Sequence, residues 1–242
     1  MPAQTVKIKS STGGAFDCTI ALPAGDEAAP AVVLASAVHG VDQDLRAIAD
    51  AFAAQGFIAA APDLFWRTIP GPLTRADGEK TTARSQPRGE KLKTGEADLA
   101  DVLTHLRTLK NFNGRAAVMG FCYSGPYAII APKRLGYAAG ISCHGSRMQD
   151  YIGELDGVTA PVLIIWGDDD NQAPPEVLDM YRKAAARMSN VELHIFPGVK
   201  HGYMMPAAGA AYDEKTREFS MARTLALLAT LRGGGAAMKK AS

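Results

Sequence analysis

The sequence predicts an α/β protein with a mostly parallel central sheet and helices on both faces. Short, wholly apolar segments recur along the chain, which is typical of strands buried on both faces. Segments with apolar residues at helical spacing separate them, and this alternation favours parallel strands joined by helices. Apolar residues make up 47% of the 242 residues, which is enough for the core of a large domain.

The chain shows no internal repeat and no linker. We therefore expect one domain over residues 1–232. Glycine, alanine and lysine predominate after it, so residues 233–242 are expected to form a flexible C-terminal tail.

Strands are predicted where apolar or alternating segments end at turn-forming residues. They cover residues 5–9, 16–21, 31–35, 57–61, 116–119, 140–143, 162–167 and 191–196. The first two are expected to form a hairpin. Amphipathic helices are predicted where apolar residues recur every three or four positions. They lie around residues 45–52, 99–106, 178–185 and 214–232. The polar segment 67–89 contains three prolines and is predicted to run over the surface.

The most informative segment is Gly-Phe-Cys-Tyr-Ser-Gly at residues 120–125. It lies between a short apolar strand and an apolar helical segment, which is the pattern of a nucleophile elbow. Gly120 and Ser124 stand two places on either side of Cys122, where a sharp turn needs small residues. Cys122 is thus the candidate nucleophile. Ser124 is the weaker alternative, because a shifted elbow would place Pro126 at a position that needs a small residue.

A cysteine nucleophile needs a base to take its proton and a third group to orient that base. With a nucleophile elbow, the expected order along the chain is nucleophile, acid, histidine. Asp168, Asp169 and Asp170 directly follow one predicted strand, and His201 follows the last one. We prefer Asp170 as the acid for its place between Gly167 and Pro174, while the other two aspartates remain alternatives.

These residues resemble the Cys-Asp-His triad of the dienelactone hydrolase family, within the α/β-hydrolase superfamily. Residues 62–67, Pro-Asp-Leu-Phe-Trp-Arg, are also similar to a segment of that family, and the resemblance runs over about residues 31–201. It implies an α/β-hydrolase fold without a large cap domain, no metal and no organic cofactor. It also implies a carboxylic ester or lactone hydrolase of the carboxymethylenebutenolidase class, which acts on a small molecule through a thioester intermediate.

The chain departs from the family at two places. In dienelactone hydrolases a glutamate near the oxyanion strand helps to ionise the thiol, and Ala37 stands at that place here. His201 is therefore expected to generate the thiolate alone, as an ion pair. The family also holds a substrate carboxylate with arginines, one of them shortly after the histidine, where this chain has none. The family resemblance therefore does not extend to dienelactone specificity.

Further site residues are expected around this triad. The backbone N–H groups of Val38 and Tyr123 are expected to form the oxyanion hole. His39, Arg84 and His144 are candidate substrate-binding residues. For His39 a loop-packing role is an equal alternative. Arg84, or alternatively Arg88, would replace a family arginine.

Two other functions compete with hydrolysis. A non-catalytic α/β-hydrolase-fold module that binds a ligand would explain the missing glutamate and arginine, although the triad weighs against it. A redox protein using Cys122 ranks lower, because the chain has no Cys-x-x-Cys motif.

Net charge and composition limit the kinds of binding partner that are expected. A net charge of +1 is too small to attract the protein to nucleic acid or to anionic lipid. No apolar segment is long enough to span a bilayer, and no signal peptide is evident at the start. The three cysteines do not form a disulfide framework, so a cytoplasmic protein is expected, as a monomer or a homodimer.

Overall fold

A computed structural model describes residues 3–233. The chain divides into two compact units, of which the first ends at Ala116 and the second begins at Ala117. The prediction of one domain over residues 1–232 remains a prediction. The tail predicted for residues 233–242 lies, apart from Gly233, outside the described residues.

The first unit holds four strands of an eight-stranded sheet, in the order β1-β2-β4-β3. Its strands are β1 Gln4–Lys9, β2 Ala15–Ala21, β3 Ala29–Ala35 and β4 Ile58–Pro62. The predicted hairpin is confirmed, since β1 pairs antiparallel with β2. β2 is also antiparallel to β4, whereas β3 and β4 are parallel.

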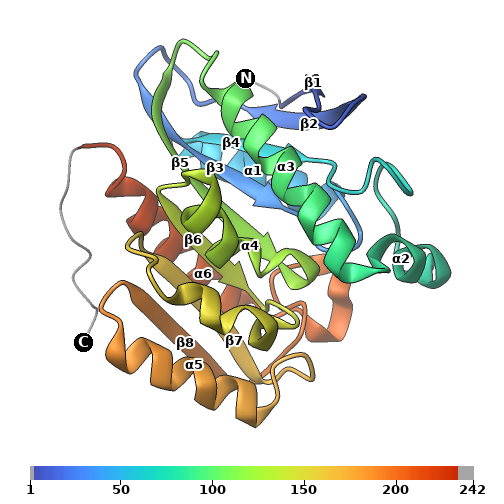
Figure 1. Ribbon diagram of the computed structural model, residues 1–242, viewed down its shortest axis with the longest axis vertical. Coiled ribbons are helices and arrows are strands. Elements are labelled where there is room, and N and C mark those ends of the chain that lie inside the picture. Colours follow the sequence, from blue (N-terminus) through green and yellow to red (C-terminus); the bar gives the residue numbers. More distant parts are fainter. Residues whose placement is uncertain (1–2, 234–242) are drawn as a thin grey trace. The chain divides into compact units, whose positions relative to one another are not determined.

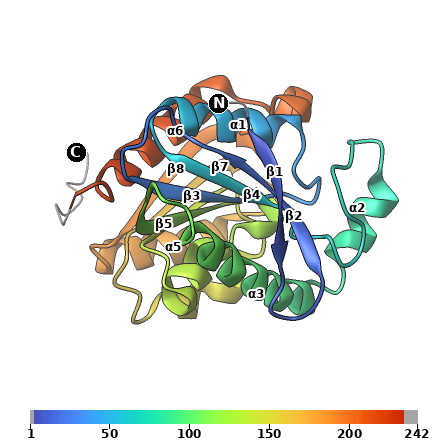
Figure 2. The same ribbon diagram turned by 90° about the horizontal axis from the view of Figure 1, so that it is seen from above.

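Two long helices cover the sheet of the first unit. α1 (Gln43–Ala54) lies on one face and α3 (Arg88–Leu106) on the other (Figure 2). α1 begins where the Asp42 carboxylate accepts a hydrogen bond from the backbone N–H of Leu45, at 3.0 Å. Its apolar residues at helical spacing are the buried ones, as the sequence predicts.

The segment 67–89 runs over the surface as predicted, with nearly all of its residues exposed or half-buried. It also contains a helix that was not predicted, α2 (Gly78–Ser85), and α3 already begins at Arg88. Arg84 is fully buried within it. Its guanidinium donates hydrogen bonds to three backbone carbonyls, those of Val38, Ile69 and Gly71. These acceptors compensate the desolvation of the charge, which explains how one charged side chain of this surface segment can be buried.

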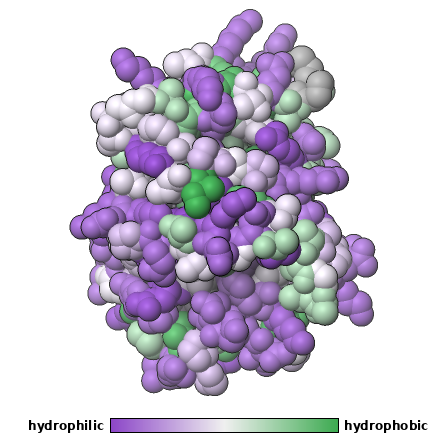
Figure 3. Space-filling view, turned by 90° about the vertical axis from the view of Figure 1, so that its right-hand side faces the viewer, coloured by the Kyte–Doolittle hydropathy of each residue, from purple (hydrophilic) through white to green (hydrophobic). Residues whose placement is uncertain are grey.

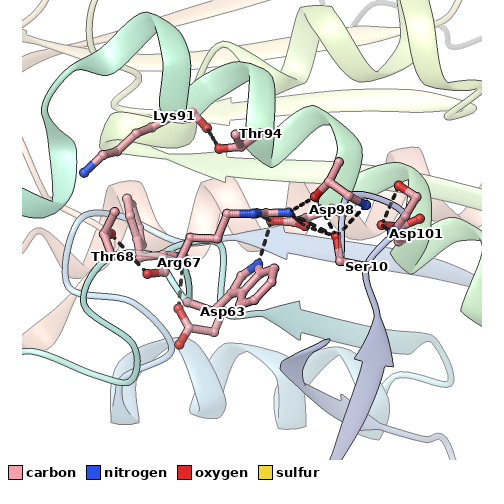
Figure 4. A network of polar contacts seen from close by, with 12 residues as sticks. Ser10, Asp63, Arg67, Thr68, Lys91, Thr94, Asp98 and Asp101 are labelled. Carbon is pink, nitrogen blue, oxygen red and sulfur yellow. Dashed lines mark hydrogen bonds and ion pairs between the residues drawn. The ribbon is translucent and has the colours of Figure 1, made fainter. Parts of the chain in front are cut away.

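A buried carboxylate joins three parts of the first unit (Figure 4). Asp98 of α3 is completely buried and forms two hydrogen bonds with Arg67, at 2.6 and 3.0 Å. It also accepts from the indole N–H of Trp66 at 3.1 Å and from the hydroxyl of Ser10 at 3.4 Å. The Arg67 guanidinium stacks 4.2 Å above the Trp66 ring. Trp66 and Arg67, which the resemblance singled out, thus tie the segment after β4 to α3.

The second unit holds four parallel strands in the order β5-β6-β7-β8. They are β5 Phe112–Phe121, which begins in the first unit, β6 Ala139–Cys143, β7 Val162–Asp169 and β8 Val191–Lys200. α6 (Glu214–Ala229) lies on one face, and α4 (Tyr127–Ile130) and α5 (Pro175–Arg187) lie on the other (Figures 1 and 2). A core cluster between β7, α4 and α5 includes Ile164, Trp166 and Tyr181.

Short helical turns complete the second unit. They are the 3-10 turns Cys122–Ser124, Met148–Leu155 and Pro206–Ala211, and a π-helical turn over Ala131–Leu135. The helix predicted after the elbow is therefore broken into α4 and the π turn. Pro132 lies at this break, where it cannot donate a backbone hydrogen bond.

Large apolar side chains are almost entirely buried in the part of the chain that the structure describes. Among the described residues, Met180 is the one large apolar side chain with substantial exposure, at 37%. The face drawn in Figure 3 is mostly hydrophilic, with hydrophobic residues in small groups between polar ones. In the described part of the chain, no helix has the length and apolar character needed to cross a membrane.

Replacing Asp98 by alanine should lower the free energy of unfolding by about 3 kcal/mol or more, because the donors of Arg67 and Trp66 then lose a buried acceptor. Urea denaturation followed by circular dichroism measures the loss. Asp101→Ala on the same helix is the matched control. Asp101 caps the N–H and hydroxyl of Ser11 at an exposed position, so its loss should cost less than about 1 kcal/mol. Equal losses in the two variants would contradict a special role for Asp98.

Candidate active site

Cys122 lies at the sharp turn between β5 and the helical turns that follow. Its φ of 51° is in the left-handed region, which is unusual for a residue with a side chain. Its carbonyl accepts hydrogen bonds from the N–H groups of Gly125, at 3.0 Å, and Ser146, at 2.9 Å. These bonds hold the turn from both sides, and the side chain of Cys122 remains partly exposed.

The small residues of the elbow are required by close backbone contacts. A Cβ atom on Gly120 would lie 2.1 Å from the carbonyl oxygen of Ser124. A Cβ atom on Gly125 would lie 2.4 Å from the Cα of Gly145. Ser124 is fully buried at the position two places after the cysteine. The turn therefore accommodates a serine at residue 124, whereas residues 120 and 125 must be glycine because a side chain would collide with the backbone.

Asp170 and His201 form the second part of the site. Asp170 follows β7 and is 3% exposed, and His201 directly follows β8. The Nδ1 atom of His201 lies 2.9 Å from each carboxylate oxygen of Asp170. The other two aspartates are exposed, and Asp168 accepts a hydrogen bond from the N–H of Gly198 at 2.6 Å. Of the three candidate acids, Asp170 is therefore the one in contact with the histidine.

The histidine connects the aspartate to the cysteine. Burial lowers the pKa of His201, but hydrogen bonds and charges from Asp170 and Cys122 outweigh it and raise that pKa from 6.5 to about 10. Because Asp170 occupies Nδ1, Nε2 is the ring nitrogen left for the sulfur. The Asp170 carboxylate and the sulfur of Cys122 thus both favour the protonated form of the ring, which is the geometry that an imidazolium–thiolate pair needs.

The His144 ring packs against His201, and the Tyr203 ring packs against His144. The ring centroid of His144 lies 5.0 Å from that of His201 and 5.2 Å from that of Tyr203, and both pairs meet edge to face. The Tyr203 hydroxyl lies 3.0 Å from that of Ser220, which donates to the carbonyl of Thr216 in α6. The loop after β8 is thus anchored to α6, two residues beyond the histidine.

Cys143 lies close to this cluster but has a different environment. It is completely buried, and burial raises the pKa of its thiol to about 12 in spite of interactions with Tyr203 and Ser220. A thiol that stays neutral and buried is a poor nucleophile. Cys122 is therefore the better candidate of the two.

The structure brings together four of the predicted site residues, Cys122, Asp170, His201 and His144, all in the second unit. Tyr123 directly follows the nucleophile in the elbow turn and is 3% exposed.

Val38, His39 and Arg84 belong to the first unit. Arg84 uses its terminal nitrogens on backbone carbonyls of that unit. His39 contacts Arg75 at 3.3 Å, and burial and the nearby arginines lower the pKa of its ring to about 4. Their roles in the oxyanion hole and in substrate binding remain predictions.

Sequence reasoning did not identify Ser146, Tyr203 or Ser220 as parts of the site. Their contributions depend on backbone donation and ring packing, for which spacing gives no signal. The parallel register of β5 and β6 pairs Phe121 with Cys143, so the residues that follow them, Cys122 and His144, lie at neighbouring strand ends. The described residues contain no group of three or more metal-ligating side chains.

Comparison with known proteins identifies the family. The sequence profile of the dienelactone hydrolase family matches residues 16–232. The chain belongs to the dienelactone hydrolase family. It is 28% identical over 234 residues to carboxymethylenebutenolidase 1 of Cupriavidus pinatubonensis, covering 96% of this chain and 99% of that protein. Family membership confirms the prediction of a hydrolase.

Solved structures show the same fold. A dienelactone hydrolase-like promiscuous phosphotriesterase from metagenomic libraries matches with a TM-score of 0.78 at 18% identity, covering 96% of this chain and 99% of the other. Dienelactone hydrolase from Anabaena variabilis matches with a TM-score of 0.63 at 17% identity, covering 94% and 95%. The predicted α/β-hydrolase fold is therefore confirmed.

Gly120→Ala should disrupt the elbow. The added methyl group meets a backbone carbonyl that cannot move without opening the turn, so we expect a loss of about 3 kcal/mol or more. Gly153→Ala is the matched control, because a Cβ at residue 153 meets nothing within 4 Å. Chemical denaturation of both variants measures the difference. A stable Gly120→Ala variant would contradict the close contact with Ser124.

The raised pKa of His201 can be measured directly by NMR of its ring nitrogens in ¹⁵N-labelled protein. Since this pKa is about 10 when folded and about 6.5 when unfolded, protonation of His201 stabilises the fold fully below about pH 6.5. This contribution is lost as pH rises through about 10. In Cys122→Ala the midpoint should fall, because the sulfur no longer stabilises the imidazolium. Equal midpoints in wild type and variant would show that the two side chains do not interact.

Proposed function

We propose that the protein hydrolyses small carboxylic esters or lactones with Cys122 as nucleophile, His201 as base and acid, and Asp170 as the group that orients His201. The observation that carries this proposal is the contact of both Asp170 oxygens with Nδ1 of His201, together with the raised pKa that the ring owes to Asp170 and Cys122. The carboxymethylenebutenolidases among its relatives support the choice of ester and lactone substrates.

The reaction proceeds in two steps. The Cys122 thiolate attacks the carbonyl carbon, and collapse of the tetrahedral intermediate breaks the ester C–O bond and leaves a thioester. His201 gives its proton to the departing alkoxide. The neutral ring then takes a proton from water as the water oxygen attacks the thioester carbonyl. Collapse of this second tetrahedral intermediate breaks the C–S bond, releases the carboxylic acid and restores the thiolate beside the protonated ring.

Three elements of the chain support this mechanism. The positive φ of Cys122 lifts the sulfur out of the strand at the start of the turn. The Asp170 carboxylate holds the ring in the tautomer that presents Nε2 to the sulfur. The N–H groups of Tyr123 and Val38 are the proposed donors to the oxyanion, and loss of such a donor costs about 3–4 kcal/mol of transition-state stabilisation.

The proposal also covers the partners, the cellular location and the oligomeric state of the protein. The substrate is a small molecule, and no nucleic acid or membrane takes part. We place the protein in the cytoplasm because the three cysteines have unrelated spacings and no disulfide joins them. A monomer or a homodimer is the proposed oligomeric state.

Cys122→Ala should reduce the turnover of p-nitrophenyl acetate by at least about a thousandfold, because no other group can form the covalent intermediate. The free energy of unfolding should change by less than about 1 kcal/mol, since the side chain is partly exposed. A spectrophotometric assay and urea denaturation measure the two effects. Cys143→Ala is the matched control and should retain turnover while losing stability.

Iodoacetamide separates the competing functions. Wild-type turnover that stops after alkylation of Cys122, identified by mass spectrometry, supports the hydrolase. Turnover that survives alkylation contradicts the assignment of the nucleophile. Absence of turnover toward a panel of aryl esters and lactones, combined with tight binding of one of them, would favour the non-catalytic module.

A further inference from the structure

His144 occupies an unusual backbone position at the end of β6. Its φ is 41°, in the region that favours glycine, and its side chain is only 1% exposed. Its N–H donates to the carbonyl of Ile165 in β7 at 2.9 Å. Residues with side chains are held in such conformations only where their surroundings determine them, and they are concentrated at functional sites.

The ring of His144 bridges two parts of the candidate active site. On one side lies Phe121, the residue before the nucleophile, with ring centroids 6.2 Å apart. On the other lie the rings of His201, at 5.0 Å and 76°, and Tyr203, at 5.2 Å and 80°. His144 therefore packs between the strand that carries Cys122 and the loop that carries His201.

The hydrogen bonds of His201 hold one of its two ring nitrogens. Nδ1 lies 2.9 Å from both oxygens of Asp170, so the carboxylate fixes this nitrogen. Hydrogen bonds to a carboxylate still permit small coupled changes in χ1 and χ2 of His201, which tilt the ring and move Nε2 away from the sulfur of Cys122. A ring packed edge to face against the imidazole limits this tilting.

We propose that His144 is a positioning residue, whose flat ring keeps the imidazole of His201 aligned between Asp170 and Cys122. The inference rests on the proposed function, in which His201 is the base. A ring that is 1% exposed offers a substrate almost no surface, so the action of His144 passes through His201. Tyr203, anchored on Ser220, also packs against His144.

The shape of the ring, and not its titration, is what this role requires. A flat ring of similar size should therefore substitute for the imidazole, whereas a small polar side chain that tolerates a positive φ should not. His144→Phe and His144→Asn make this distinction, since asparagine is among the residues that adopt the left-handed conformation most readily.

Two measurements test the proposal. The first is kcat and KM with p-nitrophenyl acetate, and the second is the alkylation rate of Cys122 by iodoacetamide from about pH 5 to about pH 9, which reports the imidazolium–thiolate pair. We expect His144→Asn to lower kcat by about 10- to 100-fold, with KM changed less than about threefold. Its alkylation near pH 6 should slow as well. His144→Phe should keep both rates within about threefold of wild type.

His194→Asn is the matched control in the same unit. His194 lies on β8, and its ring also meets an aromatic ring edge to face, that of Phe219 at 4.7 Å. It contacts Glu192 at 2.5 Å, which is in turn bound by Arg223, and it does not contact His201 in any described interaction. The same substitution there should lower stability without changing kcat or the alkylation profile.

A folded His144→Asn variant with wild-type kcat and alkylation profile overturns the proposal, and so does a His144→Phe variant as slow as His144→Asn. If His144→Asn does not fold, the decision passes to His144→Phe. Wild-type rates in that variant support the proposal, and a tenfold slower alkylation at unchanged stability overturns it. Absence of esterase turnover in the wild type counts against the proposed function alone, because alkylation of Cys122 needs no ester and still compares the variants.

Discussion

The left-handed backbone turn at Cys122 is the constraint on which the arrangement of the second unit depends. A non-glycine residue in this conformation costs about 1–3 kcal/mol, so the surroundings must compensate it. Two N–H groups bind the carbonyl of Cys122, and the absence of a side chain at Gly120 lets the turn close on the carbonyl of Ser124. The sulfur consequently lies where the adjacent strands end, which is also where Asp170 and His201 begin their loops.

Buried charge is handled in the same way throughout the chain, by direct pairing. The Asp98 carboxylate receives Arg67, Trp66 and Ser10, and the Arg84 guanidinium is distributed over three carbonyls. The Asp170–His201 pair follows the same rule but differs in one respect. Its second partner is a thiol that can lose a proton, so the pair can change its protonation, whereas the pairs of the first unit serve as fixed connections.

Much of this organisation could be predicted from the sequence, because it depends on local patterns. Strands buried on both faces are wholly apolar, and the elbow has a fixed spacing of small residues, so the sequence alone predicts both. The order of cysteine, aspartate and histidine also gave the contact between Asp170 and His201. Contacts between residues far apart in the sequence could not be predicted in this way. The burial of Arg84 depends on carbonyls up to 46 positions away, and the contact of His144 with His201 depends on two loops meeting over strand ends. Neither leaves a periodic signal.

The three thiols differ in a way that makes them internal reporters of local opening. Cys18 is completely buried in the first unit and Cys143 in the second, and burial raises the pKa of both, whereas Cys122 is partly exposed and paired with an imidazole. Once Cys122 is blocked, modification of Cys18 requires transient unfolding of the first unit, and modification of Cys143 requires that of the second. Pulsed thiol labelling, followed by mass spectrometry of the peptides, would thus show whether the two units unfold locally together or independently. It needs no engineered probe.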